Sequence, residues 1–502
     1  MGSFVRKVKT ASGATAVQIV HKRGKQRLGI DHIGSAHDQG ELELLLQVAR
    51  ERLVQGQDEL ELGWEPTGRP PGQAVVESTA SAVLWDALSS VYDGLGFDVL
   101  GDECFRQLVL ARIVEPTSKL DSIRVLDGLG VAAPSLSTIK RTLPRINKGD
   151  YRDLLARACW DHVTAKGGVA LVMYDVTTLY FEAENEDALR RVGMSKERRV
   201  DPQITVGLLV DPTGFPLEVH MFEGNKAETT TLLPVIEAFQ ARHQVRDLVV
   251  VADAGMLSAA NLNALEDAGF SFIVAARQSK APAELQGHFE AHGNYLADGA
   301  TFEVTRPMGV GKDRRDRRVV WHYLSARARR DQQTLNKQIE RAETIADGKA
   351  PIGKHRFVTL EGATKGVDWT LVERARAAAG FKGYVTNLDP DLLDGPAVVA
   401  TYRDLWNVEA SFRMAKSDLA ARPIYHYKRE SIDAHLTVVF AALAIARTIQ
   451  ARTGLSIKKF LHALRPLTSA VINTGTQTLT IPPAISPEAQ QILDALPGQG
   501  VH

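Results

Sequence analysis

The pattern of apolar and polar positions changes near residue 168, which divides the chain into two kinds of structure. Between 80 and 165, apolar residues recur at helical spacing and predict several helices. After 168, apolar runs alternate with amphipathic segments. The expected order is β-β-β-α-β-α-β, with strands at 168–183, 204–211, 215–225, 247–255 and 270–277 and helices at 228–243 and 258–269. This alternation predicts an α/β fold in which helices flank a mixed sheet.

The pattern also predicts domain boundaries. An N-terminal β-hairpin, a helix at 40–55 and a Gly/Pro-rich linker make up the first region, and short strands around one charged helix indicate a β-rich insertion in the core. The predicted regions are 1–75, a helical region at 76–165 that is a candidate for DNA binding, the first part of the core at 166–278, the insertion at 279–380, the second part of the core at 381–450, and a short helical tail at 451–502.

Two basic segments are candidates for DNA contact. The helices expected at 117–130 and 135–146 resemble a helix-turn-helix, although a plain helical bundle is the alternative and Pro144 interrupts the second helix. The stretch 306–330 holds nine Lys or Arg residues against two Asp residues. It is either a DNA-binding lobe or a solvated charged face.

Composition restricts the class of protein. The 60 basic and 60 acidic residues give a formal net charge of zero, so any nucleic-acid binding must come from local patches. The two cysteines exclude a disulfide scaffold and fit a reducing, cytoplasmic location. The longest apolar run, 438–446, is too short to cross a bilayer and predicts a core helix.

Two acids follow apolar strand segments. Asp175 closes the run VALVMYD, and Asp253 closes LVVVAD. Either acid alone could simply cap a turn. The first and fourth strands of the expected order are natural neighbours, however, so the two carboxylates would meet beyond the same sheet edge. Adjacent carboxylates repel unless a cation lies between them, and oxygen ligands favour Mg²⁺ or Mn²⁺. Two such ions would support phosphoryl transfer.

A third acid, Glu409, lies in the segment YRDLWNVEASFRMAK, residues 402–416. On a continuous helix, Tyr402, Glu409 and Lys416 fall within an arc of about 60°, with Arg413 beside it. A surface pair between Glu409 and Arg413 is the alternative. Trp406 lies near the same face, where it would either stack on an unpaired base or enter the core.

These segments resemble the DDE transposases of bacterial insertion sequences, in the superfamily named after insertion sequence four. The quoted blocks are MYDVTTLYFEAE, EGNKAETTTLLPVI, VVADAGMLSAANL and SFRMAKSDLAARPIYHYKRESIDAH, and they cover roughly 165–450. The family signature Y-x2-R-x3-E-x6-K is matched by Tyr402, Glu409 and Lys416. Leu405 stands where the family has Arg, and Arg403 or Arg413 would have to replace it.

The resemblance implies an RNase H-like catalytic core in which Asp175, Asp253 and Glu409 hold two Mg²⁺ ions. Water would cut a phosphodiester at the transposon end, and the freed 3′-hydroxyl would attack target DNA. Tyr402, Arg403, Trp406, Arg413 and Lys416 would contact DNA. The expected partners are terminal inverted repeats, target DNA and a second copy of the chain, with no membrane. A non-catalytic DNA-binding relative and a nuclease with the same core are the alternatives.

Overall fold

The protein divides into two compact units, which are described separately. The computed structural model describes residues 2–9, 15–23, 26–36, 42, 45–46, 48–49, 75–165, 167, 169–182, 185–194, 200–245, 248–256, 258–276, 296–351, 355–361, 364–474 and 477–497. The N-terminal unit comprises Met1–Gln73 with Thr474–Thr476, and the main unit comprises Ala74–Asn473 with Gln477–His502.

The N-terminal unit contains an antiparallel sheet of order β1-β2-β3. Its strands are β1 (Gly2–Lys9), β2 (Thr15–Arg23) and β3 (Gln26–Ala36). The predicted hairpin is therefore present and gains a third strand. Val17, Ile19 and Ala49 form a small buried cluster. The five described residues between 42 and 49 are helical, as predicted, and the linker expected at 62–74 lies outside the described residues.

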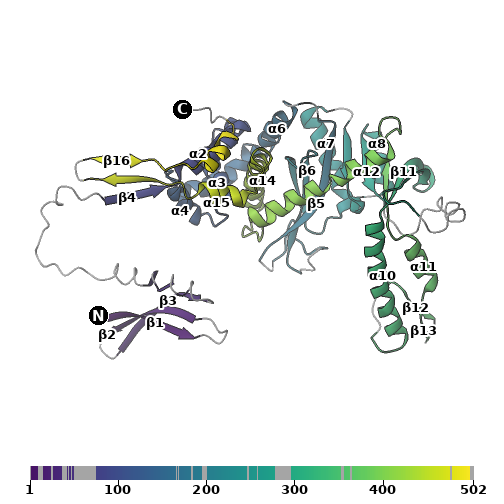
Figure 1. Cartoon of the computed structure of the whole chain (residues 1–502), viewed down its shortest axis with the longest axis horizontal. Helices are drawn as coiled ribbons and strands as arrows, with labels where there is room; N and C mark the ends of the chain where they lie inside the picture. Colours follow the sequence, from purple (N-terminus) through teal and green to yellow (C-terminus); the bar gives the residue numbers. More distant parts are fainter. Residues whose placement is uncertain are drawn as a thin grey trace, which may run out of the picture. The chain divides into compact units, whose positions relative to one another are not determined.

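An eight-stranded mixed sheet forms the centre of the main unit (Figure 1). Its order is β10-β11-β14-β9-β8-β5-β6-β7. The strands are β5 (Leu171–Tyr180), β6 (Gln203–Val210), β7 (Pro216–Glu223), β8 (Val249–Ala252), β9 (Ser271–Ala275), β10 (Thr301–Met308), β11 (Arg315–Tyr323) and β14 (Phe381–Thr386). Every residue of β6 is buried, whereas burial alternates along the edge strand β10. A strand covered on both faces is apolar throughout, and an edge strand is not.

Five of these strands have the arrangement expected of an RNase H-like core. β5, β6 and β7 are antiparallel neighbours, and β8 and β9 continue the sheet parallel to β5. The first and fourth strands are therefore adjacent, as predicted. The connecting helices are α7 (Leu232–His243) and α8 (Ala259–Asp267), with 3₁₀ turns at η2 (Glu228–Thr230) and η3 (Ala254–Met256). The mixed α/β class is thus confirmed.

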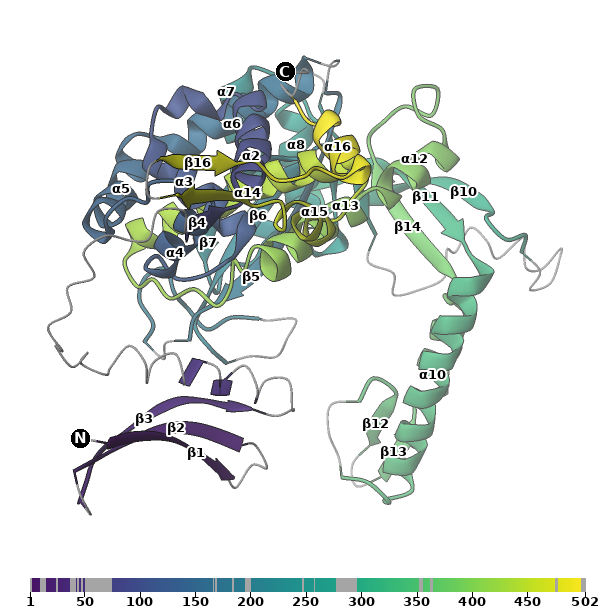
Figure 2. The same ribbon diagram turned by 60° about the vertical axis from the view of Figure 1, so that its left-hand side comes forward.

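The segment expected as an insertion contains more helix than predicted, and it also extends the sheet. β10 and β11, joined through the 3₁₀ turn η5 (Gly311–Asp313), pair with β14, which in turn pairs with β9. Between β11 and β14 lie α10 (Ser325–Ala346), β12 (Val358–Glu361), β13 (Thr364–Val367) and α11 (Trp369–Ala377). In Figure 2, α10 leads away from the sheet, and β12 and β13 lie near its far end. This part has its own apolar cluster, which includes Leu335, Ile339 and Phe357.

The helical region before the sheet begins with β4 (Val75–Ala80). Its helices are α2 (Ala82–Gly94), η1 (Phe97–Leu100), α3 (Glu103–Val114), α4 (Asp121–Gly128), α5 (Leu136–Lys148) and α6 (Tyr151–Thr164). The side chains of Asp102 and Ser135 accept backbone N–H groups at the starts of α3 and α5. The expectation that Pro144 interrupts the helix is wrong, because α5 continues to Lys148. DNA binding by α4 and α5 stays a prediction.

The apolar run at 438–446 lies within α14 (Arg429–Thr453). Within the described ranges, this one helix is long and apolar enough to cross a membrane, yet 89% of its most apolar window is buried inside the protein. It packs against α3, α5 and β7. The predicted core helix is confirmed.

The C-terminal segment, predicted as helical, also forms a hairpin. α15 (Ile457–Leu464) and α16 (Pro487–Asp494) enclose β15 (Ser469–Asn473) and β16 (Thr478–Ile481). β15 pairs with β4 and completes a sheet of order β16-β15-β4. β15 forms because it pairs with β4, almost 400 positions earlier in the chain. The local pattern of apolar residues does not reveal such a distant partner.

Candidate active site

Asp175 and Asp253 lie side by side because of the register of two parallel strands. The parallel pairing of β5 with β8 ends at Tyr174 and Ala252, and each acid is the next residue in its chain. Neighbouring strands lie about 4.8 Å apart, so the two carboxylates leave the sheet close together. Asp253 follows the end of its strand as predicted. Asp175 does not end its strand, because β5 continues to Tyr180 through antiparallel pairing with β6, in which Asp175 faces Leu208.

Glu409 reaches this area from a helix that is not continuous. α12 (Gly395–Arg403) ends before a turn at Asp404 and Leu405, and α13 (Trp406–Arg413) follows. A π-helical turn, η6 (Met414–Asp418), comes next. The assumption of one uninterrupted helix from 402 to 416 is therefore wrong. Glu409 lies in the first turn of α13.

One pocket of about 300 Å³ brings the three acids together. Its lining consists of Asp175, Asp253, His322, Leu324, Arg327, Lys382, Tyr384, Tyr402, Arg403, Leu405, Trp406 and Glu409. Seven of these residues belong to the set discussed from the sequence. We call this space the carboxylate pocket.

Two predicted DNA-binding residues do not line the carboxylate pocket. Arg413 is exposed, at the end of α13. Lys416 lines a small apolar cavity with Thr177 and Leu179 of β5. Lys416 lies in the π-helical turn, whose wider winding moves it off the face calculated for a regular helix.

Tyr402 contacts a carboxylate directly. Its hydroxyl donates a 2.9 Å hydrogen bond to Oδ1 of Asp253. Burial, and then the charge of Asp253, raise the pKa of Tyr402 far above its usual range, so the hydroxyl keeps its proton and acts as a donor. The ring also packs against Tyr384, with 4.8 Å between ring centroids. Tyr402 therefore positions Asp253 in this state.

Basic side chains oppose the three acids, and the sequence motif did not reveal three of them. His322 comes from β11, Arg327 from the first turn of α10, and Lys382 from β14. The Nζ atom of Lys382 lies 4.2 Å from the ring centroid of Tyr402. Burial, and then Arg327, lower the pKa of Lys382, while Asp253 and Glu409 act in the opposite direction. The sequence shows Lys382 only as a lysine within the apolar strand FKGYVT. Nothing in the neighbouring residues indicates that it lies near the acids.

Leu405 occupies a wall of the carboxylate pocket and is 8% exposed. Arginine is nonetheless available there, since Arg403 and Arg327 both line the pocket. Of the two replacements considered from the sequence, Arg403 therefore has the suitable position and Arg413 does not. Trp406 is 60% exposed, so the core position is wrong and a contact with a ligand stays open.

Three arginines of the basic stretch 306–330 bind other parts of the fold. Arg317, 2% exposed, binds Glu266 and Asn263 at 2.8 Å each. Arg315 pairs with Glu266 and Asp267 on α8. Arg318 pairs with Glu303 and donates to two backbone carbonyls. These three arginines attach β11 to its neighbours, whereas Arg327 of the same stretch lines the carboxylate pocket. DNA binding by the rest of the stretch stays a prediction.

The acids of the carboxylate pocket have the donor chemistry for a hard divalent cation. Asp175 and Asp253 supply carboxylate oxygens from adjacent strands, and Glu409 supplies a third carboxylate. Within the described residues, no three His, Cys, Asp or Glu side chains lie close enough to hold one ion together.

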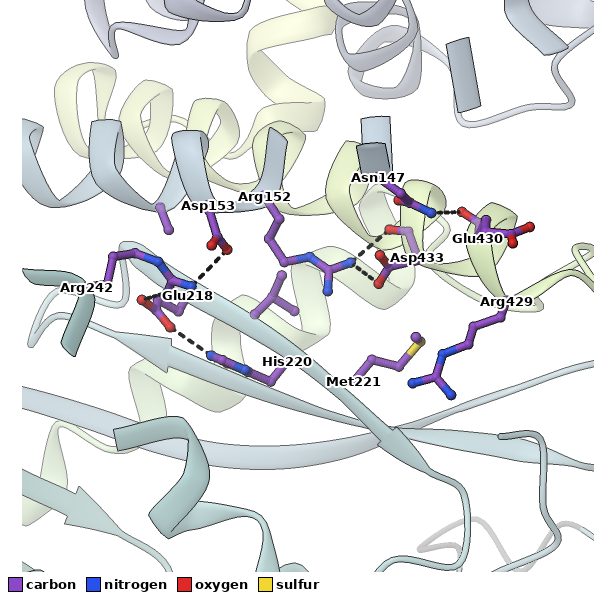
Figure 3. A pocket seen from close by; sticks show the side chains of 12 residues that line it. Asn147, Arg152, Asp153, Glu218, His220, Met221, Arg242, Arg429, Glu430 and Asp433 are labelled. Atoms are coloured by element: carbon purple, nitrogen blue, oxygen red, sulfur yellow. Dashed lines mark hydrogen bonds and ion pairs between the residues drawn. The ribbon is translucent and has the colours of Figure 1, made fainter. Parts of the chain in front are cut away.

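A second charged pocket of about 390 Å³ lies beside β7 and has a different character (Figure 3). Glu218, 1% exposed, accepts hydrogen bonds from Arg242 and, at 2.7 Å, from His220. Arg242 also pairs with Asp153 at 2.8 Å, and Arg152 pairs with Asp433 at 2.5 Å. Acids neutralise the cations here, so this ion-paired pocket stabilises the fold. His220 therefore has a structural role, as the partner of Glu218.

Comparison with known proteins identifies the family. The transposase DDE domain family matches residues 171–445, more than half of the chain, and the protein therefore belongs to this family. No curated protein matches the chain.

Two solved transposase structures are similar to the chain. One is a piggyBac transposase synaptic complex with hairpin DNA, at 10% sequence identity over 83% of this chain and 74% of that chain, with a TM-score of 0.35. Another is the Mos1 transposase paired-end complex with the left transposon end, at 14% identity over 45% of this chain and 66% of that chain, with a TM-score of 0.16. TM-scores this low carry no argument about this chain.

Proposed function

We propose that this protein is the transposase of a bacterial insertion sequence. It would bind the terminal inverted repeats of its element, cut the DNA there, and join the freed 3′ ends to target DNA. The observation that carries the proposal is the register of β5 and β8, which puts Asp175 and Asp253 side by side in the pocket that also receives Glu409. Membership of the transposase DDE domain family supports the same reaction.

The carboxylate pocket would use Mg²⁺, with Mn²⁺ as a substitute, held by Asp175, Asp253 and Glu409. Two bound ions supply activation of the attacking oxygen and stabilisation of the leaving oxygen. The protein's own groups orient the reactants. Tyr402 keeps Asp253 in place, and Arg403, Arg327 and Lys382 would contact phosphate oxygens around the scissile bond. Trp406, exposed at the rim, would stack on a base.

The proposal also implies the partners of the protein, its assembly and its compartment. The partner is double-stranded DNA, first the element ends and then the target. Two copies of the chain would act on paired ends as a homodimer. The compartment would be the cytoplasm, where the chain reaches the nucleoid and needs no membrane. Both cysteines are free and buried, which suits a reducing compartment.

The test uses the DNA that flanks the gene as substrate. The purified protein with Mg²⁺ should nick this DNA at the 3′ ends and join it to a second duplex. Asp253→Asn should abolish nicking without loss of DNA binding. Asp404→Asn is the matched control, because Asp404 is exposed in the turn before α13 and does not line the carboxylate pocket.

The products separate the alternatives. Nicking without joining would leave a nuclease with the same core. DNA binding without nicking would leave a non-catalytic relative. Full activity in Asp253→Asn would remove this aspartate from the reaction.

A further inference from the structure

A third cavity, of about 730 Å³, lies between the helical region and the chain that follows Glu409. Its walls come from α3, the segment after α3, α5, residues 420–426 and α14. Six basic or imidazole side chains line it, namely Arg112, Lys119, Lys140, Arg422, His426 and His435. All of its lining residues belong to the described part of the chain, and none of them is Asp or Glu. We call this space the basic cavity.

Three side chains of the basic cavity, Arg112, Lys119 and His435, bind neutral groups. Arg112 donates to the backbone carbonyl of Ala420 at 3.2 Å. The Nζ atom of Lys119 lies 2.9 Å from Nε2 of His426. His435 donates from Nε2 to the carbonyl of Ala421 at 3.1 Å. These bonds fix the positions of the side chains without neutralising their charge.

The electrostatic consequence is repulsion between the cations of the basic cavity, which also keeps the imidazoles neutral. Burial, and then the charge of Arg112, lower the pKa of Lys119 to about 8. Burial, Lys119 and Arg112 lower the pKa of His426 to about 4. The ion-paired pocket of Figure 3 shows the opposite arrangement, since Arg242 and Arg152 have carboxylate partners there. Clustered, partly buried cations are costly where the described lining of the cavity offers no acid, which points to an anionic ligand.

The mouth of the basic cavity indicates which kind of anion binds. Tyr425 lines the cavity and is 73% exposed, and Tyr427 is 69% exposed. Lys428 follows in the chain and is exposed as well. Exposed aromatic and basic side chains beside a buried cationic site suit an extended polyanion with bases better than a small free anion.

We propose that the basic cavity holds one backbone phosphate of bound DNA, at a position separate from the scissile phosphate. Arg112, Lys119 and His426 would contact the phosphate oxygens, and Tyr425 and Lys428 would contact the neighbouring nucleotides. That the phosphate belongs to DNA rests on the proposed function, whereas the anion site is inferred from the lining of the basic cavity alone. Such contacts fix the register of DNA on the protein without reading its sequence.

The test compares charge-removing variants that keep side-chain volume. Binding of a labelled mixed-sequence duplex is measured in EDTA across salt concentrations from about 50 to 200 mM. Lys119→Met should weaken binding about tenfold and make the logarithmic salt slope shallower by about 1. Lys140→Met should act in the same direction. Lys459→Met is the control, because Lys459 is exposed on α15 and does not line the basic cavity.

Thermal unfolding separates this role from a purely structural one. Lys119→Met should unfold at the same or a higher temperature than the wild type, because it removes a cation that has no acidic partner. Inorganic phosphate should raise the unfolding temperature of the wild type more than that of Lys119→Met. An unchanged salt slope in both the Lys119 and Lys140 variants would overturn the proposal.

Two further outcomes distinguish the possible failures. If Lys119→Met reduces the rise of the unfolding temperature with inorganic phosphate and yet leaves the salt slope of DNA binding unchanged, the ligand of the basic cavity is a free anion, and the proposed DNA contact is wrong. If the slope changes as expected but the wild type never nicks DNA in Mg²⁺, the transposase proposal fails while the phosphate site stands.

Discussion

The hydrogen bond between Tyr402 and Asp253 ties a helix to the end of a parallel strand. Tyr402→Phe removes only the hydroxyl and keeps the ring contact with Tyr384. Asp253 then loses a donor that holds its orientation. We expect Mg²⁺-dependent nicking to slow about tenfold and the free energy of unfolding to change by no more than about 1 kcal/mol. Single-turnover nicking and urea unfolding measure the two quantities.

A second tyrosine provides the control for this prediction. Tyr323 lies on β11 and packs on Phe381, and it lines neither the carboxylate pocket nor the basic cavity, so Tyr323→Phe should leave the nicking rate unchanged. Equal rates for Tyr402→Phe and the wild type would show that the hydroxyl has no positioning role. A large loss of stability would instead assign Tyr402 to folding.

Arg403 is the residue that we expect to replace the arginine missing at Leu405. It lines the carboxylate pocket, whereas Arg413 does not. Removing a charge-assisted contact with a phosphate costs about 1.5–3 kcal/mol, so Arg403→Ala should reduce the nicking rate about 10- to 100-fold. Arg413→Ala, the matched control from the next helix, should have little effect on the rate at saturating DNA. The opposite ranking would contradict the placement of these residues.

The acids of the site were predictable from the sequence, and most of the opposing bases were not. Asp175 and Asp253 follow apolar segments whose strand order can be inferred, so their proximity follows from topology. Lys382 and Arg327 enter the same pocket from distant elements, through the pairing of β14 with β9 and the start of α10. No periodic pattern in either segment relates them to the acids.

At the scale of elements, tertiary contacts decide where the helix carrying Glu409 breaks. The Asn407 side chain donates to the carbonyl of Pro212 at 2.8 Å, and the Ser411 hydroxyl donates to that of Gly214 at 2.7 Å. Both bonds attach α13 to the turn between β6 and β7. A helical projection from the sequence assumes that nothing outside the helix acts on it. It therefore grouped Tyr402 with Glu409 correctly but misplaced Arg413 and Lys416.

The ion-paired pocket predicts a dependence of stability on pH. Burial opposes ionisation of Glu218, but hydrogen bonds from His220, His243 and Arg242 outweigh it and lower the pKa of Glu218 from 4.5 to about 2. Ionised Glu218 is more stable in the folded than in the unfolded protein, so it stabilises the fold above about pH 4.5. This contribution disappears as the pH falls toward 2 and Glu218 becomes protonated in the folded protein too. Glu218→Gln should therefore cost about 3 kcal/mol of unfolding free energy at neutral pH, and little near pH 2.

Chemical denaturation at several pH values measures this effect. Glu237→Gln is the matched control, because Glu237 is exposed on α7, the helix that also carries Arg242. A stability difference for Glu218→Gln that stays constant from pH 7 to acid would show that the loss comes from packing and not from ionisation.

For the whole molecule, zero net charge conceals a strong separation of charge. Three acids face basic side chains in the carboxylate pocket, the described lining of the basic cavity has cations and no acids, and three arginines of β11 pair with acids within the fold. The sequence predicted that any DNA binding would be local, and it selected the stretch 306–330. Ion pairs to α8 neutralise part of that stretch, and only the folded structure shows which basic residues keep acidic partners.

The main unit should fold without the N-terminal unit. Its principal apolar cluster runs from Leu84 to Leu496 and, within the described residues, includes none of residues 1–73. Deletion of 1–73 should therefore leave one cooperative unfolding transition, with a melting temperature within about 4 °C of the full-length value, the shift that about 1 kcal/mol produces. Calorimetry and circular dichroism test this expectation. Deletion through Gly94 is the contrasting variant, because it removes Leu84, Leu88 and Val91 from the cluster and should abolish cooperative unfolding. If both deletions unfold non-cooperatively, the N-terminal unit is required for the core, and the two units are not independent in folding.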